Sequence, residues 1–359
     1  MADVIAITSY WGYWTHDRMW AFILTAATLL LLLVLNLLTV KLFGELEFWF
    51  ALIKIVAIGI LIVVAVVLII MGFTSPGGYK ASVSNLWTHG GFAPKGWSGF
   101  FGGFQIAVFA YVGIELVGTT SAETRDPRKT MPKAINAVPV RVLVFYVVAL
   151  LAMMCVIPWN LIEKDSSPFV QMFGLVGFTA AAGIMNFVVL TSAASSANSG
   201  VYSTSRMLYG LAHKGMATRA FGKLTRNGVP GWGLVCTVIL IGSALILAAK
   251  DTVMGAFTLV TTVSAVLFIF VWSMILVSYI VHVRRNPQAH AESIYPMPGA
   301  HFMPWVVLAF FVFVVVLLAG ADDTRQALLA TPVWFIVLGI AWVIVRRRSH
   351  SDDLEDVTD

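Results

Sequence analysis

Long apolar runs recur along the whole chain, and they constrain its fold more than any other feature. Each is close to the roughly 20 residues that an α-helix needs to cross the hydrocarbon core of a bilayer. Because lipid offers the backbone no hydrogen-bond partner, such runs fold as helices. We therefore predict an all-α, polytopic membrane helix bundle. The predicted spans are residues 19–40, 48–71, 99–118, 138–158, 173–211, 231–249, 253–283, 302–320 and 328–345.

The composition supports a membrane protein and excludes several other classes. Hydrophobic residues make up 59% of the chain and charged residues 11%, against about 25% charged in soluble domains. The net charge of +5 fits the lysines and arginines of inner loops, so we expect no nucleic-acid partner. The sequence contains no Walker loop, HExxH or GxSxG motif, and its two cysteines lack metal-ligand spacing. We expect no enzyme, no cofactor and no metal site.

The distribution of basic residues predicts the orientation of the chain in the membrane. If the first apolar stretch ends outside and the spans alternate, the inner loops hold 16 of the 23 Lys and Arg, and the outer loops six. Lys54 lies within a span. Such a bias places the C-terminus in the cytoplasm. We predict a single transporter domain over residues 1–345 and a cytoplasmic tail over residues 346–359.

The segment Phe100–Arg141 departs from a simple membrane span. Its apolar first part contains four glycines and one carboxylate, Glu115. Glycine in a helix interior costs roughly 0.5–1 kcal/mol relative to alanine, and a charge at bilayer depth costs at least about 2.5 kcal/mol. A helix that breaks open at mid-membrane to hold a polar ligand uses both features. We predict that this segment forms half of a binding site.

Two charged side chains within the spans are candidates for proton coupling. Glu115 follows small and aromatic residues, and a carboxyl group at this depth is suited to taking up and releasing a proton; the alternative is a carboxylate near the inner headgroups. Lys54 lies seven residues into the span 48–71. It either faces the bundle and exchanges a proton, or extends its ammonium group to the interface by snorkelling.

Two further segments carry polar groups. Residues 191–209 are rich in serine and threonine, including Ser195 and Ser196, and either line an aqueous path or let helices pack closely. The basic loop after the helix contains Glu123, which we consider as a latch of the cytoplasmic gate. The alternative is that the basic residues of the loop only set the membrane topology and that the loop only forms a turn between two helices.

Three long segments carry a more specific signal: KLFGELEFWFALIKI, FQIAVFAYVGIELVGTTSAETRDPRKTMPKAIN and LTSAASSANSGVYSTSRMLYGLAHKG. They resemble the amino acid permease branch of the amino acid–polyamine–organocation superfamily, and the similarity extends through essentially the whole chain. It is closest to the members that carry D-serine, D-alanine and glycine. This resemblance implies two inverted five-helix repeats and proton-coupled symport of an amino acid.

The resemblance also assigns roles to individual residues. Relatives hold the substrate at breaks in helices 1 and 6, and residues 100–118 correspond to helix 6. The implied substrate-binding residues are Phe109, Ala110, Tyr111, Val112 and Gly113 in helix 6, together with Ser195 and Ser196 in helix 8. Glu115 and Lys54 correspond to residues associated with proton coupling.

The start of the chain departs from the family pattern. The stretch ADVIAITSYWGYWTHDR is too short to cross a bilayer and resembles the later part of helix 3. We therefore expect helices 1 and 2 and part of helix 3 to be missing, and transport to be impaired in this chain.

These observations predict proton-coupled symport of small neutral amino acids, of the glycine, D-alanine and D-serine class, across the inner membrane. The expected partners are the amino acid, a proton and membrane lipid, and the sequence predicts no oligomeric state. Two alternatives stay open. One is a permease for aromatic amino acids or GABA, and the other is an uncoupled channel or receptor-like module.

Overall fold

The computed structural model describes residues 1–38, 40–115, 118, 126–163, 166–175, 177, 179–250, 252–320 and 322–355. Within these residues the secondary structure is helical apart from one isolated bridge between Thr74 and Lys80. The contacts divide the chain into two compact units. Unit 1 comprises Met1–Leu86, Leu151–Phe257 and Val333–Asp359, and unit 2 comprises Trp87–Leu150 and Thr258–Pro332.

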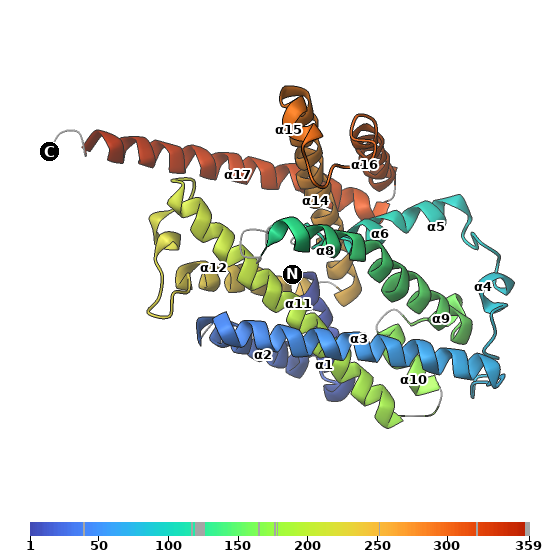
Figure 1. Ribbon diagram of the computed structural model, residues 1–359. Coiled ribbons are helices and arrows are strands. Elements are labelled where there is room, and N and C mark those ends of the chain that lie inside the picture. Colours follow the sequence, from blue (N-terminus) through green and yellow to red (C-terminus); the bar gives the residue numbers. More distant parts are fainter. Residues whose placement is uncertain are drawn as a thin grey trace. The chain divides into compact units, whose positions relative to one another are not determined.

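Figure 1 labels most helices of the two units. Unit 1 contains α1 (Ala2–Thr15), α2 (Arg18–Leu38), α3 (Val40–Ile70), η3 (Trp159–Leu161), α10 (Pro168–Leu175), α11 (Thr179–His213), η4 (Arg219–Gly222), α12 (Gly231–Gly242) and α13 (Ala244–Lys250). Unit 2 contains α5 (Gly96–Gly102), α6 (Phe104–Ala110), α8 (Pro127–Val142), the π-helical segment η2 (Leu143–Val148), α15 (Pro287–Ala291) and α16 (Met303–Gly320). Four helices cross the division: α4 (Asn85–Thr88), α9 (Ala149–Val156), α14 (Val253–Arg285) and α17 (Asp322–Glu355).

The predicted spans overlap the long helices with three differences: 99–118 is broken, 173–211 extends over both α10 and α11, and the helix that contains most of 138–158 begins at Pro127. Eight helices of the described residues are long and apolar enough to cross a membrane. They are Arg18–Leu37, Phe48–Ile70, Pro127–Val156, Ala180–His213, Gly231–Lys250, Val253–Arg285, Met303–Gly320 and Thr324–Ile344. The ninth predicted span, 99–118, is not one continuous helix. The prediction of an all-α membrane bundle is confirmed.

Helix starts follow local sequence signals. The carboxylate of Asp17 accepts a hydrogen bond from the backbone N–H of Met19 at 2.8 Å, which satisfies one of the unpaired donors at the start of α2. Proline is the first residue of both α8 and α10, where its fixed φ suits the first helical turn and its missing N–H costs nothing.

Helix α11 is the central helix of unit 1, and it packs against α1, α3, α10 and α12. Its small residues permit close approach of neighbouring backbones, as is usual between membrane helices. At Gly233 of α12, an added Cβ would lie 3.0 Å from the carbonyl oxygen of Ser205. An apolar cluster including Leu61, Ile157 and Met172 fills the space between α3, α9, α10 and α11.

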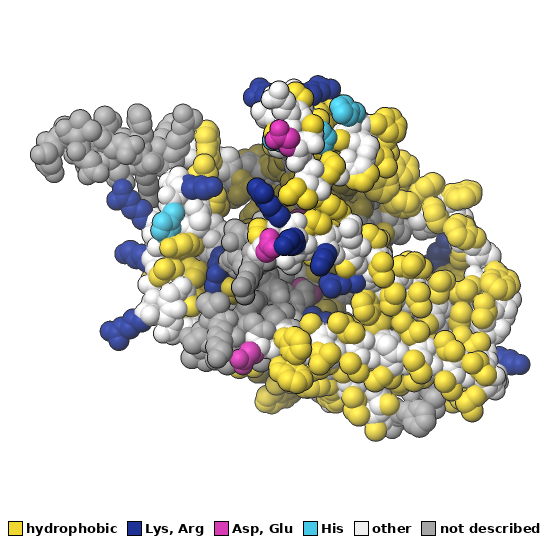
Figure 2. Space-filling model, in the orientation of Figure 1, with side chains coloured by type: hydrophobic (Ala, Val, Ile, Leu, Met, Phe, Trp, Pro, Cys, Tyr) yellow, Lys and Arg dark blue, Asp and Glu magenta, His cyan; other side chains and the backbone are white. Residues whose placement is uncertain are grey.

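The outward faces of the long helices are apolar, as a lipid environment requires. On α3, Ile55 is 51% exposed and Val63 is 62% exposed. In Figure 2, hydrophobic side chains cover most of the coloured surface over the right-hand part of this helix. In water such a surface would drive aggregation, whereas in a bilayer it contacts acyl chains.

Candidate functional site

The glycine-rich segment of unit 2 is broken where the sequence predicts a binding site. Helix α5 ends at Gly102, α6 runs over Phe104–Ala110, and the chain then forms turns as far as Glu115. Gly113 has φ +104, a conformation that residues with a Cβ rarely adopt. At the break, shorter turn bonds replace the helical ones: the N–H of Tyr111 donates to the carbonyl oxygen of Val108 at 3.1 Å, and that of Val112 to the carbonyl oxygen of Phe109 at 3.0 Å.

Glu115 folds back onto this turn. Both of its carboxylate oxygens lie 3.1 Å from the backbone N of Gly113, which donates to them. The indole Nε1 of Trp272, on α14, donates to Oε2 at 3.2 Å. The carboxylate is partly buried, and these two donors hold it against the turn. In this arrangement Glu115 stabilises the broken segment.

Tyr146 holds the other end of the break. Its hydroxyl donates to the carbonyl oxygen of Ala110 at 2.9 Å, and Ala110 is the last residue of α6. The rings of Tyr146 and Tyr111 are stacked, with centroids 6.3 Å apart and an interplanar angle of 10°. Tyr146 lies in the π-helical segment η2, and such segments often occur at functional sites.

The helix before the break is firmly packed. The amide Nε2 of Gln105 donates to the hydroxyl of Thr261 at 3.0 Å, and both side chains are buried. Val108 belongs to an apolar cluster with residues of α14 and α16, and Phe109 packs against that cluster. Because these contacts hold α6 in place, they also fix the position at which the turn after Ala110 begins.

A second polar group lies in unit 1, around the middle of α11. The ammonium group of Lys54 donates to the hydroxyl of Ser195 at 3.2 Å. The next hydroxyl, that of Ser196, donates to Asp3 Oδ2 on α1 at 3.1 Å. Lys54 and Asp3 are close enough for their opposite charges to interact. Three helices, α1, α3 and α11, therefore meet at one charged and hydroxylated cluster.

The predicted site residues fall into these two groups. The turn contains Ala110, Tyr111, Val112 and Gly113, flanked by Phe109 and Glu115. Lys54 and Ser195 are in contact in unit 1, where Ser195 is buried and Ser196 is exposed. Glu123 lies outside the residues that the structure describes.

Three residues of these groups are absent from the sequence prediction. Asp3 is visible in the sequence as a charge in an apolar stretch, and it has the same signal that drew attention to Lys54. Tyr146 and Trp272 are aromatic residues with a hydrogen-bonding group inside apolar runs. Many aromatic residues in membrane helices share that description, so only the fold distinguishes these two.

Comparison with known proteins identifies the family. Residues 1–355 match the amino acid permease family. The chain belongs to this family. The permease is 58% identical to the D-serine/D-alanine/glycine transporter of Escherichia coli (strain K12) over 353 residues, which cover 98% of this chain and 75% of the relative. It is 48% identical to the amino-acid permease AapA of Bacillus subtilis (strain 168), also over 98% of this chain and 75% of the relative.

Family membership and the long helices together establish the general class of the permease. It is a multi-pass membrane protein of amino acid transport. The family consists of transporters, so the permease is not an enzyme.

Proposed function

We propose that the permease carries glycine, D-alanine and D-serine across the inner membrane together with a proton, with its C-terminus in the cytoplasm. The observation that carries this proposal is the helix break between Ala110 and Glu115. Backbone groups at a helix break of this kind can bind the carboxylate and ammonium groups shared by all amino acids. In the structure the N–H groups of Tyr111, Val112 and Ile114 bond within the turn, so binding would exchange these bonds for bonds to the substrate. The substrate class comes from the 58% identical relative, a D-serine/D-alanine/glycine transporter.

The turn itself favours a small substrate. The segment Phe109–Gly113 contains two aromatic residues: Phe109, which packs against the apolar cluster with α14 and α16, and Tyr111, which is 42% exposed. The stacking of Tyr111 on Tyr146 restricts how far the Tyr111 ring can move. A methyl or hydroxymethyl side chain requires no such movement, whereas a large aromatic side chain does. We propose Phe109, Ala110, Tyr111, Val112 and Gly113 as substrate-binding residues, with Ser195 and Ser196 as further candidates.

Proton coupling is proposed for Lys54 and Glu115. The contact of Lys54 with Ser195 supports the view that its ammonium group faces the bundle rather than the lipid interface. A lysine beside hydroxyl groups and a carboxylate has partners in both protonation states. Protonation of Glu115 would weaken its acceptance of the Gly113 and Trp272 hydrogen bonds, and so would loosen the broken segment. Glu123 is kept as the proposed gate residue of the loop.

Uptake competition tests the substrate class. Proteoliposomes that contain the permease are given radiolabelled glycine with an inward proton gradient, and unlabelled D-alanine, D-serine, phenylalanine or GABA is added in excess. We expect D-alanine and D-serine to suppress uptake and the other two to leave it unchanged. Suppression by phenylalanine or GABA alone would instead assign the permease to those substrates, and flux without saturation would indicate a channel.

Two substitutions test the coupling residues. Lys54→Met removes the charge at similar length, and we expect loss of accumulation against a gradient while exchange of glycine continues. Glu115→Gln keeps an acceptor oxygen but cannot titrate, and we expect the same separation of accumulation from exchange. The measurements are uptake with and without a protonophore, and counterflow exchange. Unchanged accumulation in Lys54→Met would support snorkelling of that lysine.

A further inference from the structure

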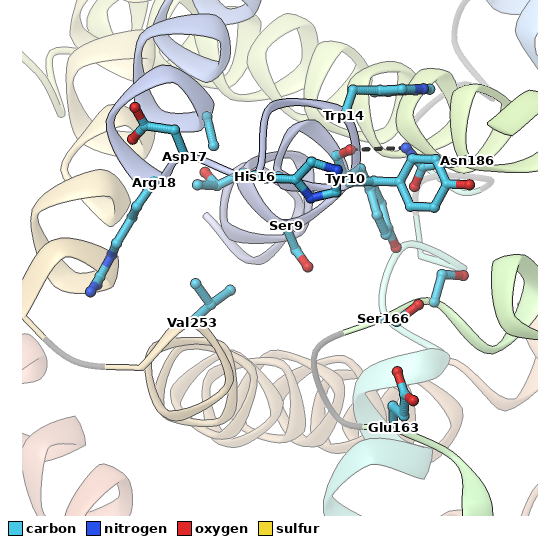
Figure 3. A pocket seen from close by; sticks show the side chains of 15 residues that line it. Ser9, Tyr10, Trp14, His16, Asp17, Arg18, Glu163, Ser166, Asn186 and Val253 are labelled. Carbon is cyan, nitrogen blue, oxygen red and sulfur yellow. Dashed lines mark hydrogen bonds between the residues drawn. The ribbon is translucent and has the colours of Figure 1, made fainter.

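A large hollow lies in unit 1, at the end that the distribution of basic residues predicts to face outward. Its volume is about 870 Å³, within the range of roughly 300–1,000 Å³ typical of ligand sites. The end of α1, the start of α2, the loop after η3, α11 and the start of α14 line it. Figure 3 shows Glu163 and Ser166 on one side of the open space, and Asp17 and Arg18 on the other.

Most charged and amide groups around this hollow already serve the fold. Arg18 donates from Nη2 to the carbonyl oxygens of Ala248 and Ala249, at 2.6 and 3.3 Å, near the C-terminus of α13. The carboxylate of Asp17 accepts the Met19 N–H that begins α2. The amide of Asn186 donates to the carbonyl oxygen of Tyr10 at 2.9 Å. These bonds fix the walls of the hollow.

Glu163 is held differently, because its backbone and not its carboxylate is fixed. Gln171 accepts from the Glu163 N–H at 3.1 Å and donates to its carbonyl oxygen at 3.0 Å. Gln171 also donates to the carbonyl oxygen of Ser166 at 3.0 Å. Within the described part of the chain, no donor contacts the Glu163 carboxylate, whose side chain is exposed.

The same loop borders a second hollow. Glu163, Ser166 and Tyr13 also line a cavity of about 440 Å³. Gln171 thus fixes the backbone of Glu163 and Ser166, and both of these residues line the larger hollow. Tyr10, Tyr13 and Trp14 supply aromatic surface to the larger hollow. Aromatic faces and carboxylates both attract ammonium groups.

We propose that this hollow is an outer binding site that recruits amino acids, in which Glu163 and Ser166 receive the substrate's ammonium group. The inference rests on the proposed function, because that function supplies the zwitterionic substrate and the outward orientation of the loop. A carboxylate attracts the ammonium end of a zwitterion at short range, and salt weakens such an exposed ion pair. The site adds affinity without taking part in coupling.

Neutralising the carboxylate tests the role of Glu163 in transport. For Glu163→Gln we expect KM for glycine to rise about two- to fivefold, the range that an exposed ion pair supports, at unchanged Vmax. The difference in KM between Glu163→Gln and the unchanged protein should become smaller as the salt concentration is raised. Glu292→Gln, which alters an exposed glutamate of a predicted inner loop, is the matched control and should leave KM unchanged. An unaltered KM in Glu163→Gln overturns the proposal.

Cysteine labelling tests the site without relying on uptake. Ser166→Cys is treated from outside with a cationic trimethylammonium thiosulfonate reagent or its anionic sulfonate counterpart, and the unchanged protein gives the background from Cys155 and Cys236. We expect the cationic reagent to react faster, glycine to slow it, and Glu163→Gln to remove the charge preference. Equal rates or no protection by glycine overturn the recruiting site. Protection without glycine uptake would leave the site standing and contradict the proposed transport function.

Discussion

Gly113 shows how one residue sets the geometry of the candidate site. Its φ of +104 lies where only glycine is comfortable, and its N–H is the donor that both oxygens of Glu115 accept. An added Cβ would meet no atom within 4 Å. The requirement for glycine at this position is therefore conformational and not steric.

Replacing Gly113 by alanine separates these two causes. The left-handed conformation costs an ordinary residue roughly 1–2 kcal/mol, so we expect Gly113→Ala to distort the turn and lower the affinity for glycine about tenfold or more. Gly102→Ala is the matched control, because Gly102 also has no atom within 4 Å of an added Cβ but lies in helix α5. We expect this control to keep its affinity, because Gly102 is a helical residue without a positive φ.

The measurements are KM for uptake and the thermal unfolding temperature in detergent. Equal behaviour of the two alanine variants would show that the turn at Gly113 does not shape the substrate site.

At the scale of single residues, the sequence predicts which groups are unusual but not what they contact. Lys54 and Glu115 stand out because a charge in an apolar run is costly. The hydrogen bonds of Lys54 to Ser195 and of Glu115 to Trp272 join residues more than 140 positions apart. Such pairs depend on which helix faces pack together, and the apolar runs of this chain show little amphipathic pattern to indicate a face.

At the scale of elements, the π-helical segment η2 contributes the side chain that binds the end of α6 at the helix break. The segment Leu143–Val148 lies between α8 and α9 and carries the Tyr146 hydroxyl that binds Ala110. The carbonyl groups in the last turn of a helix lack partners within it, so Tyr146 stabilises the end of α6 in its broken form.

Tyr146→Phe should remove the hydrogen bond to Ala110 at the end of α6 and keep the stacking on Tyr111. Loss of one hydrogen bond costs about 0.5–1.5 kcal/mol, and we expect KM for glycine to rise about fivefold with relaxed discrimination against larger amino acids. Tyr279→Phe is the control, because the buried Tyr279 hydroxyl has no hydrogen-bond partner among the described residues. Uptake competition by alanine, valine and phenylalanine measures the discrimination. The proposed clamp would be refuted by identical selectivity in both variants.

The elements themselves follow closely from the sequence. Eight of the predicted spans each overlap a long helix, because length and apolarity suffice to specify a membrane helix. The sequence also indicates by its glycines that the range 99–118 is unusual. It does not reveal where the helix ends, because Gly102, Gly103 and Gly113 are each able to break it, and Tyr146 and Glu115 stabilise the break after Ala110.

At the scale of the whole molecule, the broken segment decides the orientation of everything after it. Between Ser98 and Thr218 the structure has two helices long enough to cross a membrane, Pro127–Val156 and Ala180–His213. If the broken segment also crosses, Ser98 and Thr218 lie on opposite sides. Four further long helices follow Thr218, so the C-terminus lies on the same side as Thr218. The excess of basic residues predicts that this side is the cytoplasm.

Single cysteines at these two positions test the crossing directly. Both side chains are exposed, and a membrane-impermeant maleimide reports the side on which each lies. We expect Ser98→Cys to be labelled in intact spheroplasts, and Thr218→Cys only after the membrane is opened, with the unchanged protein giving the background. Labelling of both from outside, or of neither, would mean that the segment with the helix break does not cross the membrane. The substrate site proposed around Ala110–Glu115 requires that it does, because backbone groups exposed by a break bind a transported amino acid only at membrane depth.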